Sequence, residues 1–340
     1  MHSHKGRFEP TRFGDLTVTV DFHCHSACRF CIVQEGMNRY NGLPLGRFKQ
    51  VAEDNVKLQK HRRVVFTGGE VTLEKKLFDY IAVAREGNFE HIRVQTNGRP
   101  LKDRAFAKSL IDAGVDEFFI SLHGHDAETQ DYISQRKGSF DEAIAGIRNV
   151  KELGAVLMTN TVLTTLNVKH LANIVETVLP FHPSRMEFWN YLPMEDYDDE
   201  LNLLAPMEVL APELRRALAT AAANGIRTAV KYVPRCLLGD YADSQDNSQP
   251  DVVIVEEFYD VYPNFACFHE AQCEYAETCL GLHHPYISKF GWEEDNLKPT
   301  PRTSPWSEPE HGAWMAPDEP DGSGAGPRPS RVARSGVGRG

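Results

Sequence analysis

The alternation of short apolar runs with longer amphipathic segments between residues 16 and 190 limits the fold of this chain more than any other feature. Short apolar runs bounded by turn residues are typical of buried strands, and apolar residues three or four apart are typical of helices. Because a strand, a helix and a second parallel strand form a right-handed unit, we expect an α/β domain with a parallel sheet. The expected strands are Leu16–Asp21, Arg63–Thr67, His91–Gln95, Glu117–Ser121, Val156–Leu163 and Arg185–Asn190.

The segments between these strands predict helices, and three of them stop at Gly87, Gly114 or Gly154. Six such βα units fit a partial (β/α)6 TIM-like barrel better than a small flat sheet. One more helix and a short strand, Ile226–Val230, are expected after them. The expected helices are Phe48–Lys60, Leu73–Glu86, Asp103–Ala113, Ser139–Leu153, Val168–Leu179 and Pro206–Ala223.

The chain divides into four expected segments. Residues 1–15 are a polar N-terminal segment, 16–230 are the barrel, 231–297 are a small loop-rich C-terminal extension, and 298–340 are a tail rich in Pro and Gly that we expect to be disordered. No apolar run approaches the ~18 residues that cross a bilayer, and the N-terminus lacks the apolar stretch of a secretory signal. We therefore expect a cytoplasmic protein without a membrane partner.

The seven cysteines fall into two groups, one near the start of the chain and one in the loop-rich extension. In a reducing cytoplasm, clustered cysteines are metal ligands more often than disulfides. This distribution predicts two separate metal sites. The first group is Cys24, Cys28 and Cys31, and the second is Cys236, Cys267, Cys273 and Cys279.

The first group has the spacing C-x3-C-x2-C and directly follows the first expected strand. The C-terminal ends of barrel strands carry the chemistry in such folds. Three thiolates can bind three irons of a [4Fe–4S] cube and leave the fourth iron open to an outside ligand. Structural zinc is the alternative, with His23 or His25 as its fourth ligand.

Phe30 makes this motif C-x3-C-x-Phe-C, which resembles the signature of the radical S-adenosylmethionine (SAM) superfamily. The resemblance covers roughly residues 16–190. It implies that a [4Fe–4S] cluster binds SAM at its open iron, and that Phe30 contacts this cofactor. It also implies reductive cleavage of SAM to methionine and a 5′-deoxyadenosyl radical, which takes a hydrogen atom from the substrate. Because the radical carries the chemistry, no catalytic side chain is expected. A reducing partner such as flavodoxin or ferredoxin is expected.

The run Thr67-Gly68-Gly69-Glu70 follows the second expected strand. Two glycines let the backbone approach a ligand closely, although a plain turn has the same composition. In the family that the chain resembles, a Gly-Gly-Glu at this place binds the ammonium group of SAM. The resemblance therefore implies that Gly68, Gly69 and Glu70 contact the cofactor, with the carboxylate facing the amine.

Short polar residues at the ends of the later strands share the same barrel mouth. Gln95 and Asn97 are expected to contact the cofactor, and Ser121 resembles the ribose-contacting position of the family. Arg136 lies in a loop similar to one in the family branch that includes the molybdenum-cofactor cyclase, where an Arg reaches the SAM carboxylate. Asn160 also matches that branch and is a candidate contact to SAM or substrate. For the short polar residues, the alternative is that they only form turns. For Arg136, the alternative is a side chain exposed to solvent without a ligand.

Four residues are expected to line the substrate cavity. Glu187, Trp189 and Tyr191 alternate along the sixth strand and therefore share one face, although Trp189 can equally be a core residue. His123 follows the fourth strand at the same mouth.

In the second cysteine group, Cys267, Cys273 and Cys279 are spaced C-x5-C-x5-C, which matches no standard zinc finger. They resemble the shorter "twitch" extension of the radical SAM superfamily, which holds one auxiliary [4Fe–4S] cluster. Cys236 lies 31 positions before Cys267 and is the weakest candidate ligand. Zinc and ordinary buried cysteines stay open as alternatives, and the histidines that could replace Cys236 are His269, His283 and His284.

The formal net charge of −11 argues against a protein that binds nucleic-acid polymers, because such binding needs clustered Lys and Arg. Few residues precede the first strand, too few for a domain that binds a leader peptide. This favours a small-molecule substrate, such as a nucleoside or a natural-product intermediate, with the auxiliary cluster aiding oxidation, substrate binding or sulfur donation. The alternatives are a maturase of a ribosomally made peptide and a zinc-stabilised, non-catalytic binding protein. The cyclase's Arg- and Gly-rich tail has no match before residue 298, so the chain is not expected to be that enzyme.

Overall fold

The computed structural model describes residues 14–31, 41–193, 199, 201–253 and 264–302. The predicted N-terminal segment up to residue 13 and the predicted tail from residue 303 lie outside the described residues.

The start of the predicted tail is ordered, so its expected boundary at residue 298 is too early. Thr300 accepts a backbone hydrogen bond from Glu274 at 2.9 Å, and the backbone N–H of Arg302 donates to Gln272 at 3.2 Å. These bonds attach the segment to the cysteine-rich extension.

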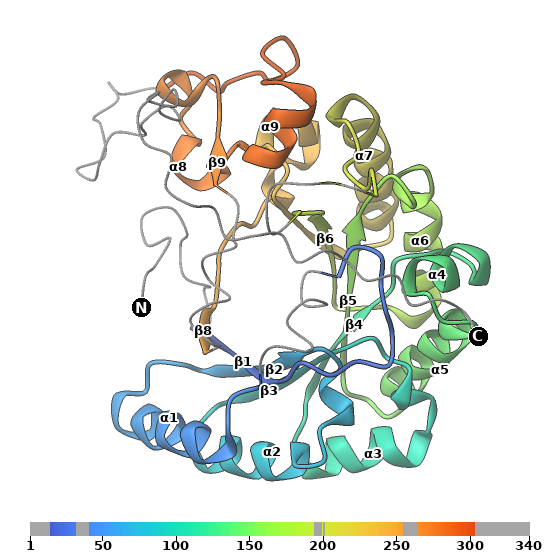
Figure 1. The fold of residues 1–340 in the computed structure, drawn as a ribbon, viewed down its shortest axis with the longest axis vertical. Helices are drawn as coiled ribbons and strands as arrows, with labels where there is room; N and C mark the ends of the chain where they lie inside the picture. The colour runs from blue at the N-terminus through green and yellow to red at the C-terminus, as the bar shows by residue number, and fades with distance from the viewer. Residues whose placement is uncertain (1–13, 32–40, 194–198, 200, 254–263, 303–340) are drawn as a thin grey trace, which may run out of the picture. The chain divides into compact units, whose positions relative to one another are not determined.

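Eight parallel strands form one sheet in the order β7-β6-β5-β4-β3-β2-β1-β8, curled into a half barrel (Figure 1). The expected partial TIM-like barrel is confirmed, with β7 at the expected short strand Ile226–Val230, and β8 is the one strand of this sheet that was not predicted. The strands are β1 (Asp15–Asp21), β2 (Arg63–Gly68), β3 (His91–Thr96), β4 (Glu117–Ser121), β5 (Val156–Leu163), β6 (Arg185–Asn190), β7 (Arg227–Lys231) and β8 (Asp251–Val253).

Strand β8 lies within the segment that we assigned to the extension. It pairs in parallel with β1, with Leu16 opposite Asp251 and Val18 opposite Val253. Only three residues long, it is too short to show a periodic pattern, which explains why the sequence did not predict it.

The helices of the barrel cover the outer face of the sheet (Figure 1). The short helix α4 was not predicted, and Asp126 caps it by accepting the backbone N–H of Thr129 at 2.8 Å. The helices are α1 (Leu45–Leu58), α2 (Leu77–Glu86), α3 (Arg104–Ala113), α4 (Ala127–Ser134), α5 (Ser139–Glu152), α6 (Leu171–Val178) and α7 (Met207–Ala223).

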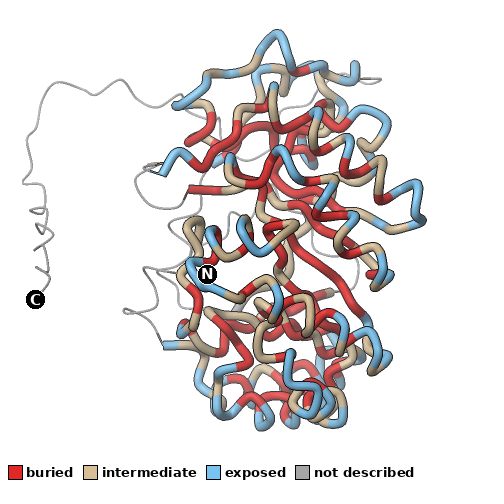
Figure 2. The backbone as a smooth tube through the Cα atoms, turned by 90° about the vertical axis from the view of Figure 1, so that its right-hand side faces the viewer, coloured by how far each residue is buried: buried red, intermediate tan, exposed pale blue. Residues whose placement is uncertain are grey.

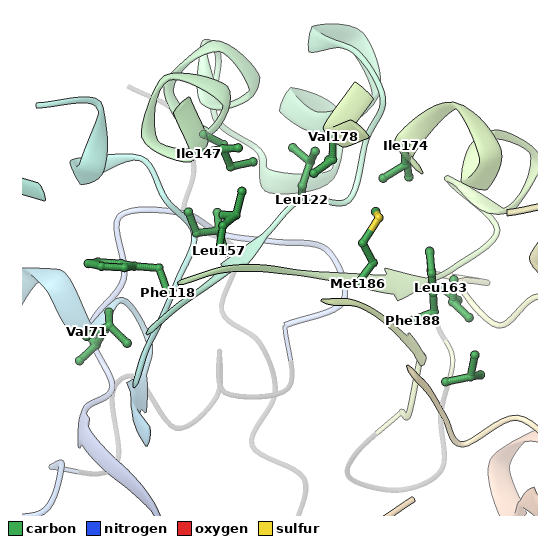
Figure 3. Packing of buried hydrophobic residues seen from close by; sticks show 14 of the residues in the cluster. Val71, Phe118, Leu122, Ile147, Leu157, Leu163, Ile174, Val178, Met186 and Phe188 are labelled. Carbon is green, nitrogen blue, oxygen red and sulfur yellow. The ribbon is translucent and has the colours of Figure 1, made fainter. Parts of the chain in front are cut away.

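The main core lies between the sheet and these helices (Figure 3). Alternate strand residues such as Phe118, Leu157 and Phe188 point into it and are fully or almost fully buried. Figure 2 marks the buried stretches of the backbone. Each such side chain contributes roughly 1.5–3 kcal/mol by burial. The intervening residues face the inside of the half barrel, and many of them are polar, among them Ser121 and Glu187.

The extension after β7 consists of short elements. Its two-stranded antiparallel sheet packs Phe265 with Leu192, Tyr232 and Leu280 in a small second cluster. No helix among the described residues is long and apolar enough to cross a membrane. The elements are η6 (Arg235–Ser244), β9 (Phe265–Ala266), η8 (Glu270–Gln272), α8 (Ala276–Cys279), β10 (Leu282–His283) and α9 (His284–Phe290).

Candidate cofactor and metal sites

The loop that carries the first three cysteines begins where β1 ends. Backbone N–H groups of Ala27 and Arg29 donate to the carbonyls of Ser134 at 3.1 Å and Ile133 at 3.0 Å, at the end of α4. The guanidinium of Arg29 also lies over the ring of Tyr132, 4.1 Å from its centroid. The unpredicted helix α4 therefore holds the cysteine loop in place.

The three thiols of this loop lie near enough to influence one another through their charge. Burial raises the pKa of Cys28 to about 12, and the neighbouring Cys31 and Cys24 add to the rise, because a second thiolate repels the first. Bound metal would offset this repulsion. A compact metal site would have three or more ligand atoms of His, Cys, Asp or Glu that all lie within 4.8 Å of one another. Among the described residues, none of these cysteines belongs to such a group. Tetrahedral zinc, with Zn–S bonds of about 2.3 Å, would hold its sulfurs closer than that.

The two early histidines belong to no compact group of ligand atoms among the described residues. The Nδ1 atom of His23 is paired with the carboxylate of Asp21 at 2.8 Å, and the only described group of three ligands that could hold a metal lies elsewhere, at His91, Asp116 and Glu117. Three thiols that form no compact ligand group with a fourth described residue fit a [4Fe–4S] cube better than zinc.

The Gly-Gly pair after β2 is required by the cysteine loop itself. A Cβ atom on Gly69 would lie 2.3 Å from the carbonyl oxygens of Phe22 and His23, and one on Gly68 would lie 1.8 Å from that of Asp21. The backbone N–H of Gly69 donates to Asp21 at 2.9 Å. The close approach that we expected for a ligand is thus made by the protein's own backbone.

Glu70 is completely buried, and its carboxylate accepts four hydrogen bonds from protein donors. It accepts from the backbone N–H and hydroxyl of Thr72 at 3.1 and 2.5 Å, from the hydroxyl of Thr96 at 2.6 Å and from the backbone N–H of Asn97 at 2.7 Å. A carboxylate has about four lone-pair sites. Three of these bonds go to Oε1 and one goes to Oε2, so Glu70 ties the end of β2 to the end of β3. The expected contact of this carboxylate with the ammonium group of SAM stays a prediction.

Asn97, which Glu70 positions, has a side chain that reaches the sulfur of Cys24. Its Nδ2 atom lies 3.9 Å from the sulfur of Cys24, and its Oδ1 atom accepts the backbone N–H of Arg99 at 3.1 Å. Its place beside Cys24 agrees with the expectation of a cofactor contact, which stays a prediction.

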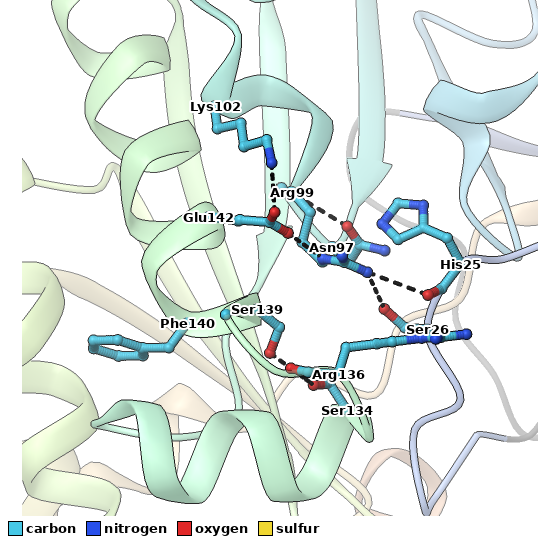
Figure 4. Close-up of polar contacts among 12 residues, drawn as sticks. His25, Ser26, Asn97, Arg99, Lys102, Ser134, Arg136, Ser139, Phe140 and Glu142 are labelled. Carbon is cyan, nitrogen blue, oxygen red and sulfur yellow. Dashed lines mark hydrogen bonds and ion pairs between the residues drawn. The ribbon is translucent and has the colours of Figure 1, made fainter.

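Arg99 is a residue that the sequence analysis missed. Its guanidinium donates to the carbonyl of His25 and the hydroxyl of Ser26, both at 3.2 Å, and to the carboxylate of Glu142 on α5 at 2.6 Å (Figure 4). It therefore fixes the cysteine loop to the barrel wall. Burial, then Arg99, lowers the pKa of His25 to about 4, so this imidazole is neutral at pH 7.

Arg136 follows α4 and is exposed beside the cysteine loop (Figure 4). Asp131 holds the surrounding turn, since its carboxylate accepts the backbone N–H groups of Gly138 at 2.5 Å and Phe140 at 3.0 Å. The turn is rigidly placed, and its arginine side chain is accessible to a ligand.

Ser121, Asn160 and Glu187 lie side by side on β4, β5 and β6, in direct register. Asn160 is 3% exposed, and its Nδ2 atom has no hydrogen-bond partner among the described residues. A buried amide without a partner costs about 1–3 kcal/mol, so this donor is well suited to a bound ligand. Gln95 faces the same side, opposite Phe119 of β4.

His123 and Phe30 bring the cysteine loop against the end of β4. Their rings meet edge to face with centroids 4.7 Å apart. The Nδ1 atom of His123 accepts the backbone N–H of Val162 at 3.1 Å, which leaves the proton of the neutral ring on Nε2. Burial lowers the pKa of His123 to about 3, so the ring stays neutral.

The substrate candidates on β6 form a polar group inside the barrel. The indole N–H of Trp189 donates to Glu187 at 2.8 Å, and Arg185 pairs with the same carboxylate at 3.1 Å. Tyr191 lies one residue beyond the end of β6, and burial raises its pKa to about 12. Lys231, which was not predicted, lies opposite Trp189 on β7.

The second cysteine group lines one cavity of about 250 Å³ in the extension, together with Arg235, His269, Tyr275 and residues 297–300. Cys236 takes part despite its distance in sequence. Burial raises the pKa of Cys267 to about 11, and the other three cysteines affect it through their charge. All four sulfurs therefore face one space, which fits a metal cluster with four thiolate ligands.

Of the three histidines named as substitutes for Cys236, only His269 lines this cavity. His283 is buried elsewhere, and its Nδ1 atom accepts the backbone N–H of Tyr286 at 3.2 Å.

Comparison with known proteins gives one family. Residues 20–178 match the family model of the Radical SAM superfamily. A "Probable GTP 3',8-cyclase" of Metallosphaera sedula is 31% identical over 210 residues, which cover 56% of this chain and 64% of the relative. The "Fe-coproporphyrin III synthase" of Methanosarcina barkeri is 34% identical over 177 residues, covering 52% and 43%. The matched stretches thus span 43% to 64% of the length of these curated relatives.

Solved structures share the fold at low identity. Native anSMEcpe with bound AdoMet has a TM-score of 0.60 at 15% identity, covering 80% of this chain and 89% of that one. Streptococcus suis SuiB bound to the precursor peptide SuiA has a TM-score of 0.55 at 16% identity, covering 86% and 62%.

Proposed function

This chain belongs to the radical SAM superfamily of enzymes, and from that membership we propose that it binds a [4Fe–4S] cluster through Cys24, Cys28 and Cys31 and cleaves SAM reductively. When bound, the reduced cluster supplies the electron that splits SAM and so yields the 5′-deoxyadenosyl radical that takes a hydrogen atom from the substrate. The observation that supports this best is that Cys24 and Cys31 lie near enough to Cys28 to affect its pKa, while no fourth described residue completes a compact ligand group with them.

The protein's own residues would place SAM at this cluster. Asn97 lies beside Cys24 and can donate to the amino acid part of SAM, while Arg136 is free to pair with its carboxylate. Phe30 would contact SAM as well, and Ser121 would contact its ribose. Gly68, Gly69 and Glu70 act on this site by holding the loop and Asn97.

We infer that the substrate is a small molecule, bound inside the half barrel against Asn160, Glu187, Trp189 and Lys231. The unpartnered Nδ2 atom of Asn160 is a donor available to it. The printed names of the sequence relatives point the same way, since they refer to GTP and to a coproporphyrin.

A peptide substrate is the second candidate. It is favoured by the likeness to SuiB bound to a precursor peptide, which extends over 86% of this chain. That likeness is one of fold alone, whereas the sequence relatives are about twice as identical, so we rank the small molecule first.

We further propose that Cys236, Cys267, Cys273 and Cys279 hold a second, auxiliary [4Fe–4S] cluster in a twitch-like extension. The shared cavity of these cysteines supports it. The rival is a protein in which this site holds zinc and which has no catalytic activity. A flavodoxin or a ferredoxin would supply the electrons.

Anaerobic reconstitution tests these proposals. We expect about eight irons per chain, falling by half in either a C24A/C28A/C31A or a C267A/C273A/C279A variant, and 5′-deoxyadenosine formed from SAM with dithionite. Zinc without iron, and no 5′-deoxyadenosine, would support the non-catalytic rival. A screen of nucleotides, tetrapyrroles and peptides for stimulated 5′-deoxyadenosine release then separates the two substrate classes.

A further inference from the structure

Four consecutive residues, Gln245–Ser248, run between the barrel and the second cysteine group. We call them the 245–248 segment. It follows β7 closely in space, since Gln245 forms a parallel bridge with Val230 and the backbone N–H of Asp246 donates to the carbonyl of Val230 at 2.9 Å. Successive side chains of such an extended segment point in opposite directions.

The side chains of Gln245 and Asn247 reach Cys279. The Nε2 atom of Gln245 lies 3.5 Å from the sulfur of Cys279, 3.3 Å from its carbonyl oxygen and 2.9 Å from that of Val233. The Nδ2 atom of Asn247 donates to the carbonyl of Cys279 at 2.9 Å and to that of Thr278 at 3.1 Å. Two side-chain amides therefore hold one cysteine from the same direction.

Asp246 and Ser248 make their contacts on the barrel side. The carboxylate of Asp246 accepts from Arg185 at 2.6 Å, and Arg185 also pairs with Glu187. The carbonyl of Ser248 accepts from the buried ammonium group of Lys231 at 2.6 Å. These partners belong to the group that also positions Trp189.

We propose that Gln245 and Asn247 are positioning residues for Cys279, and that the 245–248 segment couples the charged group inside the barrel to the auxiliary site. This inference rests on the proposed auxiliary cluster. A ligand that moves Arg185 or Lys231 pulls on Asp246 or on the carbonyl of Ser248. Gln245 and Asn247 then shift on Cys279, because they belong to the same extended backbone.

The chemical consequence is a change in the potential of the auxiliary cluster. N–H groups that donate to ligating sulfurs stabilise the reduced, more negative state and so raise the reduction potential. Cys279 has two such donors, the side chain of Gln245 and the backbone N–H of Arg235 at 3.2 Å. Removing the first leaves the second, so the site should keep its iron while its potential falls.

The test is an EPR-monitored redox titration of the reconstituted full-length chain, in which the signal that responds to SAM is assigned to the first cluster. In Gln245→Met, which has no amide, we expect a negative shift of the auxiliary midpoint potential. Gln245→Glu should shift it further, since it adds negative charge. Ser244→Ala is the matched control: Ser244 bonds Thr228 at 2.8 Å and is one residue from Gln245, but neither hydroxyl contacts Cys279 or Arg185.

The coupling is tested by Asp246→Asn, which does not touch Cys279 yet weakens the pairing with Arg185. We expect it to shift the auxiliary potential beyond the range of Ser244→Ala. About eight irons with the wild-type potential in Gln245→Met and Asp246→Asn would overturn the inference and leave the proposed cluster standing.

A measurement on the metal-free protein separates the inference from the proposed cluster. The rate at which iodoacetamide alkylates Cys279, followed by peptide mass analysis, should rise in Gln245→Met and Asn247→Ala relative to Ser244→Ala. If the chain holds only about four irons, the auxiliary cluster is refuted, and an unchanged alkylation rate would refute the positioning role as well.

Discussion

The carboxylate of Glu70 accepts the backbone N–H of Asn97 at 2.7 Å, which fixes the end of β3 to the end of β2 beside Cys24. Glu70, the acidic residue of the Gly-Gly-Glu run, thus positions Asn97 beside the cysteine loop. We expect Glu70→Gln to destabilise the fold by about 1–3 kcal/mol, because the NH2 group of the glutamine amide would face an N–H or O–H donor. Urea denaturation of the metal-free protein measures this.

Glu74→Gln is the control for that substitution, since Glu74 bonds the backbone of Lys76 at an exposed position. Equal stability of the Glu70 and Glu74 variants, together with a loss of SAM affinity in Glu70→Gln, would support a direct contact between the Glu70 carboxylate and the ammonium group of SAM.

Gly69→Ala should displace the cysteine loop, because the added Cβ would lie 2.3 Å from two carbonyl oxygens of that loop. We expect the first cluster to be lost selectively, so that the iron content falls by about half while the auxiliary signal remains. Gly46→Ala is the control, since a Cβ there meets nothing within 4 Å. Full iron loading of Gly69→Ala would show that the loop tolerates the shift.

Asn160→Ala should weaken SAM or substrate binding without destabilising the ligand-free protein. Its buried Nδ2 atom has no protein partner, so its removal relieves a cost of about 1–3 kcal/mol instead of breaking a bond. Thr159→Val is matched, since Thr159 is equally buried with an unpartnered hydroxyl but points to the opposite face. Thermal denaturation measures the stability of both variants, and equilibrium dialysis measures their affinity for SAM and substrate. Unchanged affinities in Asn160→Ala would show that the Nδ2 atom of Asn160 does not bind either ligand.

Arg99→Ala should loosen the cysteine loop and speed the loss of iron from the first cluster to a chelator. Hydrogen bonds to charged groups contribute about 1.5–3 kcal/mol, and Arg99 makes three around this loop and α5. Arg104→Ala removes only an exposed ion pair with Glu152, worth at most about 1 kcal/mol. Chelation rates that are the same in both variants would contradict the role of Arg99.

Asp246 should make stability depend on pH in the acid range. Although burial opposes it, the charge of Lys231 and the bonds from Ser248 and Arg185 lower its pKa from 3.8 to about 2. Since the folded pKa is depressed, the stabilisation is fully present above pH 3.8 and is lost as the pH falls towards about 2. The difference in denaturation midpoint between wild type and Asp246→Asn should shrink over this window, and a constant difference would count against the prediction.

Local signals carried much of the fold and of the first site. The strands β1 to β6 combine apolar runs with turn residues, and the cysteines of the first loop lie close in sequence, so both patterns are visible within a short window. The three-residue strand β8 and the short helix α4 show no such pattern. Pairing with β1 stabilises β8, and contacts with the cysteine loop stabilise α4.

The sequence alone determined that this chain is an α/β half barrel with two groups of cysteines and a radical SAM motif, since spacing and period are properties of the chain itself. Only the tertiary structure decided what those residues face. It turned Glu70 inward onto four donors, brought Cys236 to the other three late cysteines, and placed Arg99 and Gln245 beside cysteines far away in sequence. Such contacts depend on which buried groups find partners across the fold, and burial of this kind leaves no mark on neighbouring residues in the sequence.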